Sequence, residues 1–453
     1  MKINLPEDVS RIIKTLTDAG FMAFAVGGCV RDSILGRVPS DWDITTSAKP
    51  MEIKSLFRRT IDTGIEHGTV TVMIKERSYE ITTYRIDGNY SDGRHPDSVE
   101  FSTDLDEDLK RRDFTINAMA YNDEVGLVDN YGGIEDLDAH IIRAVGDPKE
   151  RFKEDALRIM RAFRFAAQLG FDIEENTVRA ASELKENLKK VSAERIHTEL
   201  IKLITSDHPE FIENMYEAGV TAVFLPEFDE CMKCEQNTPH HKYTVGHHTV
   251  VALQNLTRES CRTVDDNTFK NLRLTMLFHD FGKPSAKTTD EDTLADHFKG
   301  HPKISMDMCR EIMKRLKLDN DTINEVALLV RWHDRRPELT DKSVRRSINR
   351  IGPDIYPLTF LVARADISAQ SDYQIEEKRA YEKKLYEIYS EIIARNECVS
   401  LKDLAVNGKD LIDLGYKRGP EIGEILRSLL DMVLEDPACN KKEILLSRLE
   451  KTE

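Results

Sequence analysis

The sequence predicts an α+β protein, with a small mixed sheet and helices at the N-terminal end and helices alone in the remainder. Two observations predict this class. Segments of β-type composition occur only within the first 145 residues, and from residue 149 onward apolar residues recur with helical spacing almost throughout. With 453 residues, of which 40% are hydrophobic, the chain can bury more than one core.

Local signals divide the chain into short elements. A helix at 9–19 ends at Gly20, and a short apolar run at 21–26 meets Gly27-Gly28. The other predicted strands are 41–46, 69–74 and 79–85, followed by a polar loop at 87–96. The other predicted helices are 30–35, 150–169, 193–205, 247–257, 270–279, 303–316, 321–333, 356–369 and 374–394. From Leu401 onward, glycines between short apolar runs indicate short helices and tight turns.

Composition excludes several classes of protein. No stretch approaches the roughly 20 apolar residues of a membrane helix, and the acidic, amphipathic N-terminus is unlike a signal peptide. Seven scattered cysteines favour a reduced, cytoplasmic location. The net charge of −16 argues against non-specific coating of nucleic acid, although a nucleic-acid enzyme with local basic residues remains compatible with it.

The sharpest chemical feature is the pair Asp41 and Asp43, which would share one face of a strand. Paired carboxylates suit Mg²⁺, whereas the alternative is an exposed strand with solvated acids. Upstream, Gly27-Gly28 precedes a predicted helix carrying Arg31. Such a turn can bind a phosphate, or it can be an ordinary strand-to-helix connection.

Several ordered segments together resemble the class II nucleotidyltransferases, which include tRNA CCA-adding enzymes and bacterial poly(A) polymerases. These segments are GGCVRD (27–32), LGRVPSDWDITTSAKP (35–50), TGIEHGTVTVMI (63–74), YEITTYRIDGNYSDGRHPDSVEF (79–101), DEDLKRRDFTINAMAYN (106–122), FKEDALRIMRAFRFAAQLGF (152–171) and SAERIHTEL (192–200). The resemblance implies a polymerase β-like nucleotidyltransferase head (1–145), a neck that recognises the nucleotide base (146–205), a helical body (206–372) and a helical tail that binds tRNA (373–453).

The resemblance also implies roles for individual residues. Asp41 and Asp43 would hold Mg²⁺, with Glu80 as a third carboxylate. The implied nucleotide-binding residues are Gly28, Arg31, Arg112, Asp155, Arg158, Arg161 and Arg164. Of these, Asp155 and Arg158 would recognise the base of CTP or ATP without a nucleic-acid template. Cytosine and adenine each present an amino donor beside a ring acceptor, which one Asp and one Arg can match. The alternative is a salt-bridged stripe on a helix surface.

Eight of the thirteen histidines lie between residues 240 and 333. The order of His and Asp residues resembles the HD phosphohydrolase superfamily, whose implied ligands here are His248, His279, Asp280, His301, His333 and Asp366. This resemblance implies a divalent transition metal, with Lys283 as a phosphate contact. The alternative is a helical body that no longer binds metal. We interpret Cys231 and Cys234 as ordinary thiols.

The favoured hypothesis is a tRNA nucleotidyltransferase that builds or repairs the 3′-terminal CCA from CTP and ATP. An enzyme that adds only A, or a poly(A) polymerase, is compatible with the same fold. The intact loop at 87–94 argues against addition of CC alone. A hypothesis of another class is an HD phosphohydrolase with an inactive transferase head, against which the intact Asp41 and Asp43 count.

Overall fold

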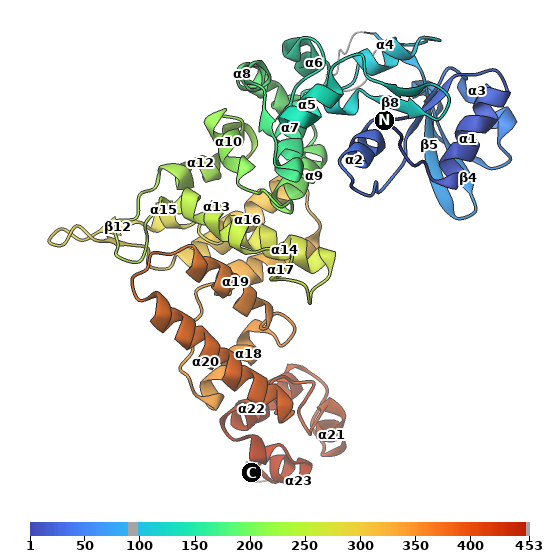
Figure 1. Cartoon of the computed structure of the whole chain (residues 1–453). Coiled ribbons are helices and arrows are strands. Elements are labelled where there is room, and N and C mark those ends of the chain that lie inside the picture. Colours follow the sequence, from blue (N-terminus) through green and yellow to red (C-terminus); the bar gives the residue numbers. More distant parts are fainter. Residues whose placement is uncertain (89–97, 450–453) are drawn as a thin grey trace. The chain divides into compact units, whose positions relative to one another are not determined.

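The computed structural model describes residues 1–88 and 98–449 and forms two compact units, Met1–Pro226 and Glu227–Glu453 (Figure 1). Most of the predicted loop at 87–96 lies outside the described residues. The predicted boundaries at 145, 205 and 372 remain predictions. No helix in the described ranges is both long and apolar enough to cross a membrane.

A seven-stranded mixed sheet forms the centre of the first unit, in the order β3-β4-β5-β2-β1-β8-β9. Its strands are β1 (Ala23–Val26), β2 (Ile44–Thr46), β3 (Thr60–Gly64), β4 (Thr69–Ile74), β5 (Arg77–Thr83), β8 (Ala120–Asn122) and β9 (Gly126–Val128). Only β2 and β5 pair in parallel within this sheet. Two small sheets pair β6 (Arg85–Asp87) with β7 (Val99–Phe101), and β10 (Ile141–Ile142) with β11 (Asp172–Ile173).

Strand β1 is buried on both faces, which explains why its sequence lacks alternation of polar and apolar residues. Ala23 and Ala25 belong to the larger core of the unit, whereas Phe24 and Val26 join a smaller core with Tyr84. A strand covered on both sides is a rigid support for the loops at its ends.

Helices surround this sheet and make up the rest of the first unit. They are α1 (Glu7–Asp18), α2 (Gly28–Ile34), α3 (Pro50–Leu56), α4 (Leu105–Lys110), α5 (Gly133–Ala139), α6 (Pro148–Glu154), α7 (Leu157–Leu169), α8 (Glu175–Leu184), α9 (Ala193–Ile204), α10 (Phe211–Glu217) and α11 (Thr221–Phe224), with 3-10 helices η1 (Ile65–His67), η2 (Thr115–Asn117) and η3 (Lys185–Lys190).

Two sequence predictions in this unit are wrong in detail. The single helix predicted at 150–169 is broken at Asp155, whose φ of −139° and ψ of 105° are extended and whose carboxylate accepts a hydrogen bond from the Leu157 amide at 3.0 Å. An aspartate that bonds the backbone in this way starts a new helix instead of continuing the old one. Likewise, Asp41 and Asp43 lie in the loop before β2 and not within a strand.

The second unit is almost entirely helical. From the unit boundary onward the elements are α12 (Pro226–Lys233), α13 (Val245–Asn255), α14 (Asp266–Phe278), α15 (Lys283–Ala286), α16 (His301–Arg315), α17 (Asn320–Trp332), α18 (Asp341–Ile351), α19 (Leu358–Ser368), α20 (Ile375–Ala394), α21 (Gly408–Asp413), α22 (Pro420–Glu435), η4 (Pro437–Cys439) and α23 (Lys442–Ser447), with a hairpin of β12 (Thr288–Thr289) and β13 (Asp296–His297).

The C-terminal helices have a core of their own, which includes Leu411, Leu429, Val433 and Leu445. The prediction of short helices only is wrong here, because α22 runs for 16 residues straight through Gly423. The apolar spacing of its buried leucines outweighs the cost of one glycine, which is about 1 kcal/mol.

The buried Arg345 joins α18 to the end of α22. It donates to the carbonyls of Leu434 (3.0 Å) and Glu435 (3.3 Å) and to the Glu397 carboxylate (2.7 Å). These bonds satisfy carbonyls that the end of a helix leaves open.

We therefore predict that Arg345→Ala lowers the free energy of unfolding by about 3 kcal/mol, because it removes a buried guanidinium and leaves two carbonyls at the end of α22 without their donor. The neighbouring Arg346, which is exposed and pairs with Glu435, is the matched control, and Arg346→Ala should cost less than about 1 kcal/mol. Calorimetric unfolding measures both, and equal losses would contradict the assignment.

Candidate functional site

The three carboxylates predicted to act together lie around the start of β2. Asp41 and Asp43 precede this strand, and Glu80 belongs to the neighbouring β5. The Val26 amide donates to the Asp43 carbonyl at 3.0 Å, which fixes the loop against β1. The pairing of Ile44 with Ile81 places Glu80 beside Asp43. The pKa of Asp43 is raised to about 6, first by loss of hydration among the surrounding protein atoms and then by the negative charges of Asp41 and Glu80. The side chain is still accessible to solvent, so a cation could reach it.

The glycine turn before α2 is constrained at Gly27 more than at the predicted Gly28. Gly27 has a φ of +80°, and a Cβ on it would lie 2.9 Å from Arg112 Nη1. The turn therefore needs glycine both for its backbone and for the approach of Arg112. Arg112 also pairs with Asp108 at 3.3 Å, and its buried Nε has no hydrogen-bond partner among the described residues.

A chain of polar contacts connects Arg31 of α2 to Arg161 of α7. Arg31 donates to Asn117 Oδ1 at 2.6 Å, Asn117 donates to Asp113 Oδ1 at 3.1 Å, and Arg161 donates to Asp113 Oδ2 at 2.7 Å. Asp113 is buried, and although burial alone would raise its pKa, Arg161 and Asn117 hold that pKa well below its ordinary value. Sequence reasoning missed Asn117 and the central position of Asp113, because the contacts that join them to Arg31 and Arg161 span 86 and 48 residues and no local pattern marks them.

The remaining predicted neck residues also have protein partners. Asp155 accepts from Arg195 at 2.6 Å, and Arg158 donates to Glu154 at 2.6 Å and to the Arg111 carbonyl at 2.9 Å. Arg164 pairs with the buried Glu199 at 2.8 Å. Asp155 directly follows α6, and Arg158 lies in the first turn of α7. Arg195 anchors Asp155, and Glu154 anchors Arg158. Arg195 and Glu199 both belong to α9; the segment 192–200 was part of the family resemblance, but neither residue was predicted to contact the site.

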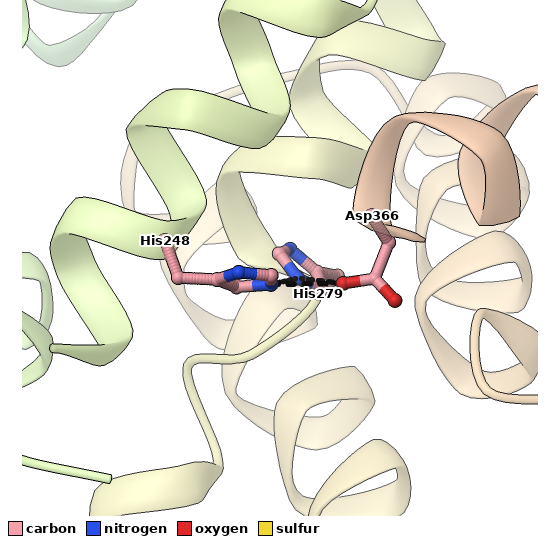
Figure 2. A group of neighbouring side chains, drawn as sticks. All are labelled: His248, His279 and Asp366. Carbon is pink, nitrogen blue, oxygen red and sulfur yellow. Dashed lines mark hydrogen bonds and ion pairs between the residues drawn. The ribbon is translucent and has the colours of Figure 1, made fainter. Parts of the chain in front are cut away.

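The histidine cluster brings together residues from five helical regions of the second unit. His248 lies on α13 and Asp366 on α19, while His279, His301 and His333 lie at the ends of α14, α16 and α17. Figure 2 shows His248, His279 and Asp366 pointing toward one another. In the described part of the chain, two groups of three have ligand atoms that all lie within 4.8 Å of one another, namely His248, His279, Asp366 and Asp280, His301, His333. Asp41, Asp43 and Glu80 do not form such a group there.

Backbone carbonyls orient all four histidines of the cluster. The Nδ1 atoms lie 2.7–3.3 Å from carbonyl oxygens of Ala369, Met276, Phe298 and Val330. A carbonyl can only accept, so each Nδ1 carries a proton, and each Nε2 faces the cluster, where it can bind a metal ion once it has no proton of its own. This arrangement is typical of histidines that bind metals.

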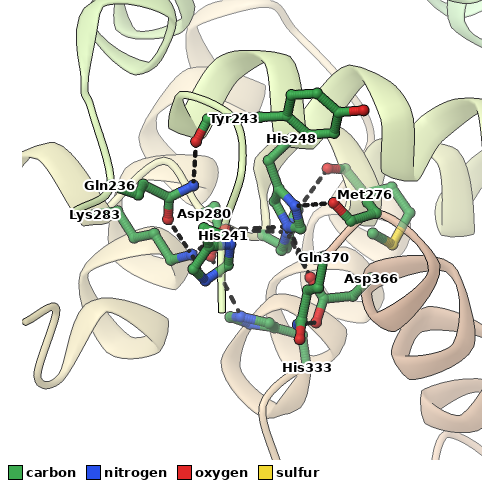
Figure 3. A network of polar contacts seen from close by, with 12 residues as sticks. Gln236, His241, Tyr243, His248, Met276, Asp280, Lys283, His333, Asp366 and Gln370 are labelled. Atoms are coloured by element: carbon green, nitrogen blue, oxygen red, sulfur yellow. Dashed lines mark hydrogen bonds and ion pairs between the residues drawn. The ribbon is translucent and has the colours of Figure 1, made fainter. Parts of the chain in front are cut away.

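Asp280 belongs to the second group and also contacts the first. Its Oδ2 is 3.2 Å from His279 Nε2, and its Oδ1 is 3.3 Å from His301 Nε2. Lys283 lies between Gln236 and Asp280, at 2.8 and 2.7 Å (Figure 3). Burial would raise the pKa of Asp280, but His279 and Lys283 hold it well below its usual range. The carboxylate is therefore a buried anion at the centre of the cluster.

A cavity of about 660 Å³ opens onto this cluster. Its lining includes Asp280, Lys283, His301, His333 and Asp366. Neither Cys231 nor Cys234 belongs to a ligand group in the described chain; both are buried thiols.

Three family models match parts of the sequence. They are the poly(A) polymerase head domain over residues 23–143, a probable RNA- and SrmB-binding site of polymerase A over 170–232, and tRNA nucleotidyltransferase domain 2 over 301–449.

Curated relatives match over most of the chain. The CCA-adding enzyme of Ligilactobacillus salivarius is 34% identical over 99% of this chain and 98% of its own length, and that of Enterococcus faecalis is 35% identical over 97% and 95%. The match to the CCA-adding enzyme of Lactobacillus helveticus is 57% identical but spans 44% of this chain and about half (49%) of that protein.

Solved structures agree with this relationship. The Bacillus stearothermophilus CCA-adding enzyme in complex with CTP matches with a TM-score of 0.70 and 28% identity, over 97% of this chain and 96% of that one. The Thermotoga maritima CCA-adding enzyme complexed with tRNA has a TM-score of 0.61 and 21% identity over the whole of both chains, which supports the fold alone.

We predict that Asp113→Asn lowers the free energy of unfolding at pH 7 by about 3 kcal/mol, because it removes the buried charge that pairs with half-buried Arg161. A carboxyl with a lowered pKa in the folded state stabilises the protein above its unfolded pKa of about 4, and this stabilisation is lost as the pH falls toward the folded pKa. The difference between wild type and variant, measured by denaturant unfolding, should therefore shrink below pH 4. A difference independent of pH would contradict the ion-pair explanation.

Proposed function

Because the chain belongs to the family of CCA-adding enzymes, we propose that it adds or rebuilds the 3′-terminal CCA of tRNA from CTP and ATP. The chain is a nucleotidyltransferase, and its relatives of nearly full length are CCA-adding enzymes. The single observation that best supports the proposal is the position of Arg112, which lies against Gly27 of the turn before α2 and whose charge acts on the pKa of Asp43 in the acidic loop. We further propose the predicted division into head, neck, body and tail, and action in the cytoplasm.

The nucleotidyltransferase family uses a divalent metal ion, and Asp41, Asp43 and Glu80 are the residues proposed to hold Mg²⁺. Their fit rests on the pairing of Ile44 with Ile81, which sets Glu80 beside Asp43, and on the negative charges of Asp41 and Glu80, which add to burial in raising the pKa of Asp43 and would be offset by a cation. When bound, Mg²⁺ would polarise the reacting phosphate and favour deprotonation of the attacking 3′-hydroxyl.

The arginines around the glycine turn are proposed to bind the triphosphate. Arg112 supports this role, because its buried Nε has no hydrogen-bond partner within residues 1–88 and 98–449 and a buried donor is costly unless a ligand satisfies it. Arg31 lies on α2, three residues after Gly28, and its guanidinium can donate two parallel bonds to a phosphate.

Base selection is proposed to rest on Asp155 and Arg158, with Arg161 and Arg164 as further nucleotide contacts. Asp155 can accept from the amino group of C or A, and Arg158 can donate to the adjacent ring nitrogen. U and G present the reverse pattern and would leave both protein groups unpaired. Anchoring by Arg195 and Glu154 limits the movement of both groups, which favours a fixed geometry over an adaptable one.

The tail is proposed to bind tRNA. Lys409, Lys417 and Arg418 are exposed around α21 and the turn before α22, where cationic side chains can contact the phosphate backbone.

We predict that Asp43→Ala lowers nucleotide incorporation at least about 1000-fold, because it removes a proposed metal ligand. Radiolabelled CTP and ATP are tested on tRNAs that end before CCA, after C and after CC. Asp62→Ala, at an exposed aspartate on β3, is the control and should retain activity.

Incorporation at wild-type rate by Asp43→Ala would contradict the assignment of the acidic loop. Wild-type protein that extends only the tRNA ending in CC would instead be an A-adding enzyme. Extension by many adenosines would make it a poly(A) polymerase.

A second candidate function is supported by the histidine cluster. We propose that it binds a divalent transition metal and hydrolyses a phosphoester, with Lys283 as a phosphate contact. The fit rests on the buried Asp280 carboxylate, which contacts both His279 and His301, and on the four histidines oriented by backbone carbonyls. When bound, such an ion would supply a nucleophilic water near neutral pH, while the cavity provides access for the substrate.

We predict that purified protein contains a transition metal and hydrolyses a 2′,3′-cyclic nucleotide or a phosphomonoester. His279→Ala should lose both the metal and the hydrolysis. CCA addition should be unchanged in this variant, because Asp41 and Asp43 lie in the other unit. His247→Ala, next to His248 but outside both groups, is the control for metal content. Elemental analysis without a transition metal, together with no hydrolysis after addition of Mn²⁺, Ni²⁺ or Co²⁺, would refute this function.

A further inference from the structure

A buried aromatic ring, Phe165 of α7, lies against three guanidinium groups. The Cζ atoms of Arg164, Arg31 and Arg161 are 3.6, 5.1 and 5.2 Å from the centroid of its ring. Phe165 is only 5% exposed, and its own position is fixed by an edge-to-face contact with Phe114 at 5.7 Å. These arginines come from two regions of the chain, since Arg31 is on α2 and the other two are on α7.

Three cations around one ring repel one another unless their charges are offset. Each has a separate acid within 2.8 Å, namely Asp32 for Arg31, Asp113 for Arg161 and Glu199 for Arg164. The electron-rich face of an aromatic ring attracts cations and contributes about 0.5–2 kcal/mol per contact. Phe165 thus offers the three arginines a shared apolar and electrostatic support that an aliphatic residue of similar size would lack.

The ring also gives Arg31 and Arg161 a second connection to each other. On one side, Arg31 reaches Arg161 through Asn117 and Asp113. On the other side, both arginines lie against Phe165. Two independent connections define the separation of these guanidinium groups better than one, because each removes freedom that the other leaves.

We propose that Phe165 is a positioning residue for nucleotidyl transfer, which holds the triphosphate-binding arginine in register with the arginines that contact the rest of the nucleotide. This inference rests on the proposed function, under which Arg31 contacts the triphosphate and Arg161 and Arg164 belong to the nucleotide site. A nucleotide bound at both ends reacts fastest when the spacing of its contacts is fixed beforehand. Phe165 itself touches no substrate and acts through the arginines.

A simple structural role predicts different behaviour. If Phe165 only fills the core, its loss lowers stability and leaves the kinetics of the folded protein unchanged. If it positions the arginines, the electrostatic character of the ring matters even where its volume is kept. Fluorinated phenylalanines test this directly, because each added fluorine weakens the attraction of the ring face for cations with little change in shape.

The experiment measures kcat and KM for CTP on tRNA lacking CCA, together with the melting temperature of each variant. Phe165→Leu should lower kcat/KM at least tenfold, mainly through KM, and Phe165→Tyr should restore it to within about threefold of wild type. Mono-, di- and trifluorinated phenylalanine at position 165 should lower kcat/KM progressively at a nearly constant melting temperature. The control is Phe163→Leu, at a fully buried residue of the same helix with no cation contact among the described residues.

Unchanged kcat/KM in Phe165→Leu, no trend along the fluorinated series, or an equal fall in Phe163→Leu would overturn the inference. Wild-type protein that fails to extend any tRNA would refute the proposed function instead. In that case calorimetric CTP binding by the same variants still decides the inference, because a tenfold weaker affinity in Phe165→Leu with rescue by Phe165→Tyr does not depend on turnover.

Discussion

The first unit depends on one buried negative charge, the carboxylate of Asp113. It lies between Asn117 and Arg161, and through them it connects α2 of the sheet region with α7 of the following helices. Burial of an ion is costly unless it is paired and hydrogen-bonded, and here both oxygens have partners. The glycine turn before α2 and the helix α7, which carries Arg161, are consequently held in one arrangement. The contacts of Phe165 with Arg31 and Arg161 reinforce this arrangement.

The second unit uses the same physical principle at Asp280. This carboxylate is buried among His279, His301 and Lys283, and its environment keeps it ionised. The carboxylates of Asp113 and Asp280 differ in the groups that contact them. Around Asp113 the protein supplies every hydrogen bond, which is a structural solution. Around Asp280 it supplies Lys283 Nζ, 2.7 Å from Oδ2, and histidine Nε2 atoms at 3.2 and 3.3 Å, and imidazole and carboxylate groups gathered in this way can also hold a metal ion.

The family and the α+β class were predictable from sequence and are confirmed, because the motifs are long, ordered and contiguous. Strand 69–74 is confirmed residue for residue, since its alternation of threonine and valine is unambiguous. The helix at 150–169 was wrong because Asp155 bonds a backbone amide of its own segment, which helical periodicity does not reveal. Residues that complete the site from far away, such as Asn117, Arg195 and Glu199, were missed because their partners lie 35 to 86 residues distant. The six His and Asp residues predicted for the histidine cluster do come together, whereas their division into two groups depends on how five helical regions pack; their role as metal ligands stays a prediction.

The placement of the histidines has a consequence for how the second unit folds. His248 and Asp366 are separated by 118 residues, yet their side chains meet at 2.8 Å. An ion bound there would act as a reversible cross-link that closes a very long loop, and the entropy lost on closing a loop grows with its length. Because His279 and His333 lie at the ends of α14 and α17 and take their orientation from carbonyls of those same helices, a correctly shaped ligand set exists only once these helices have formed. Binding of a metal ion would therefore be coupled to folding of this unit, and the cluster would report on the integrity of the helices from α13 to α19.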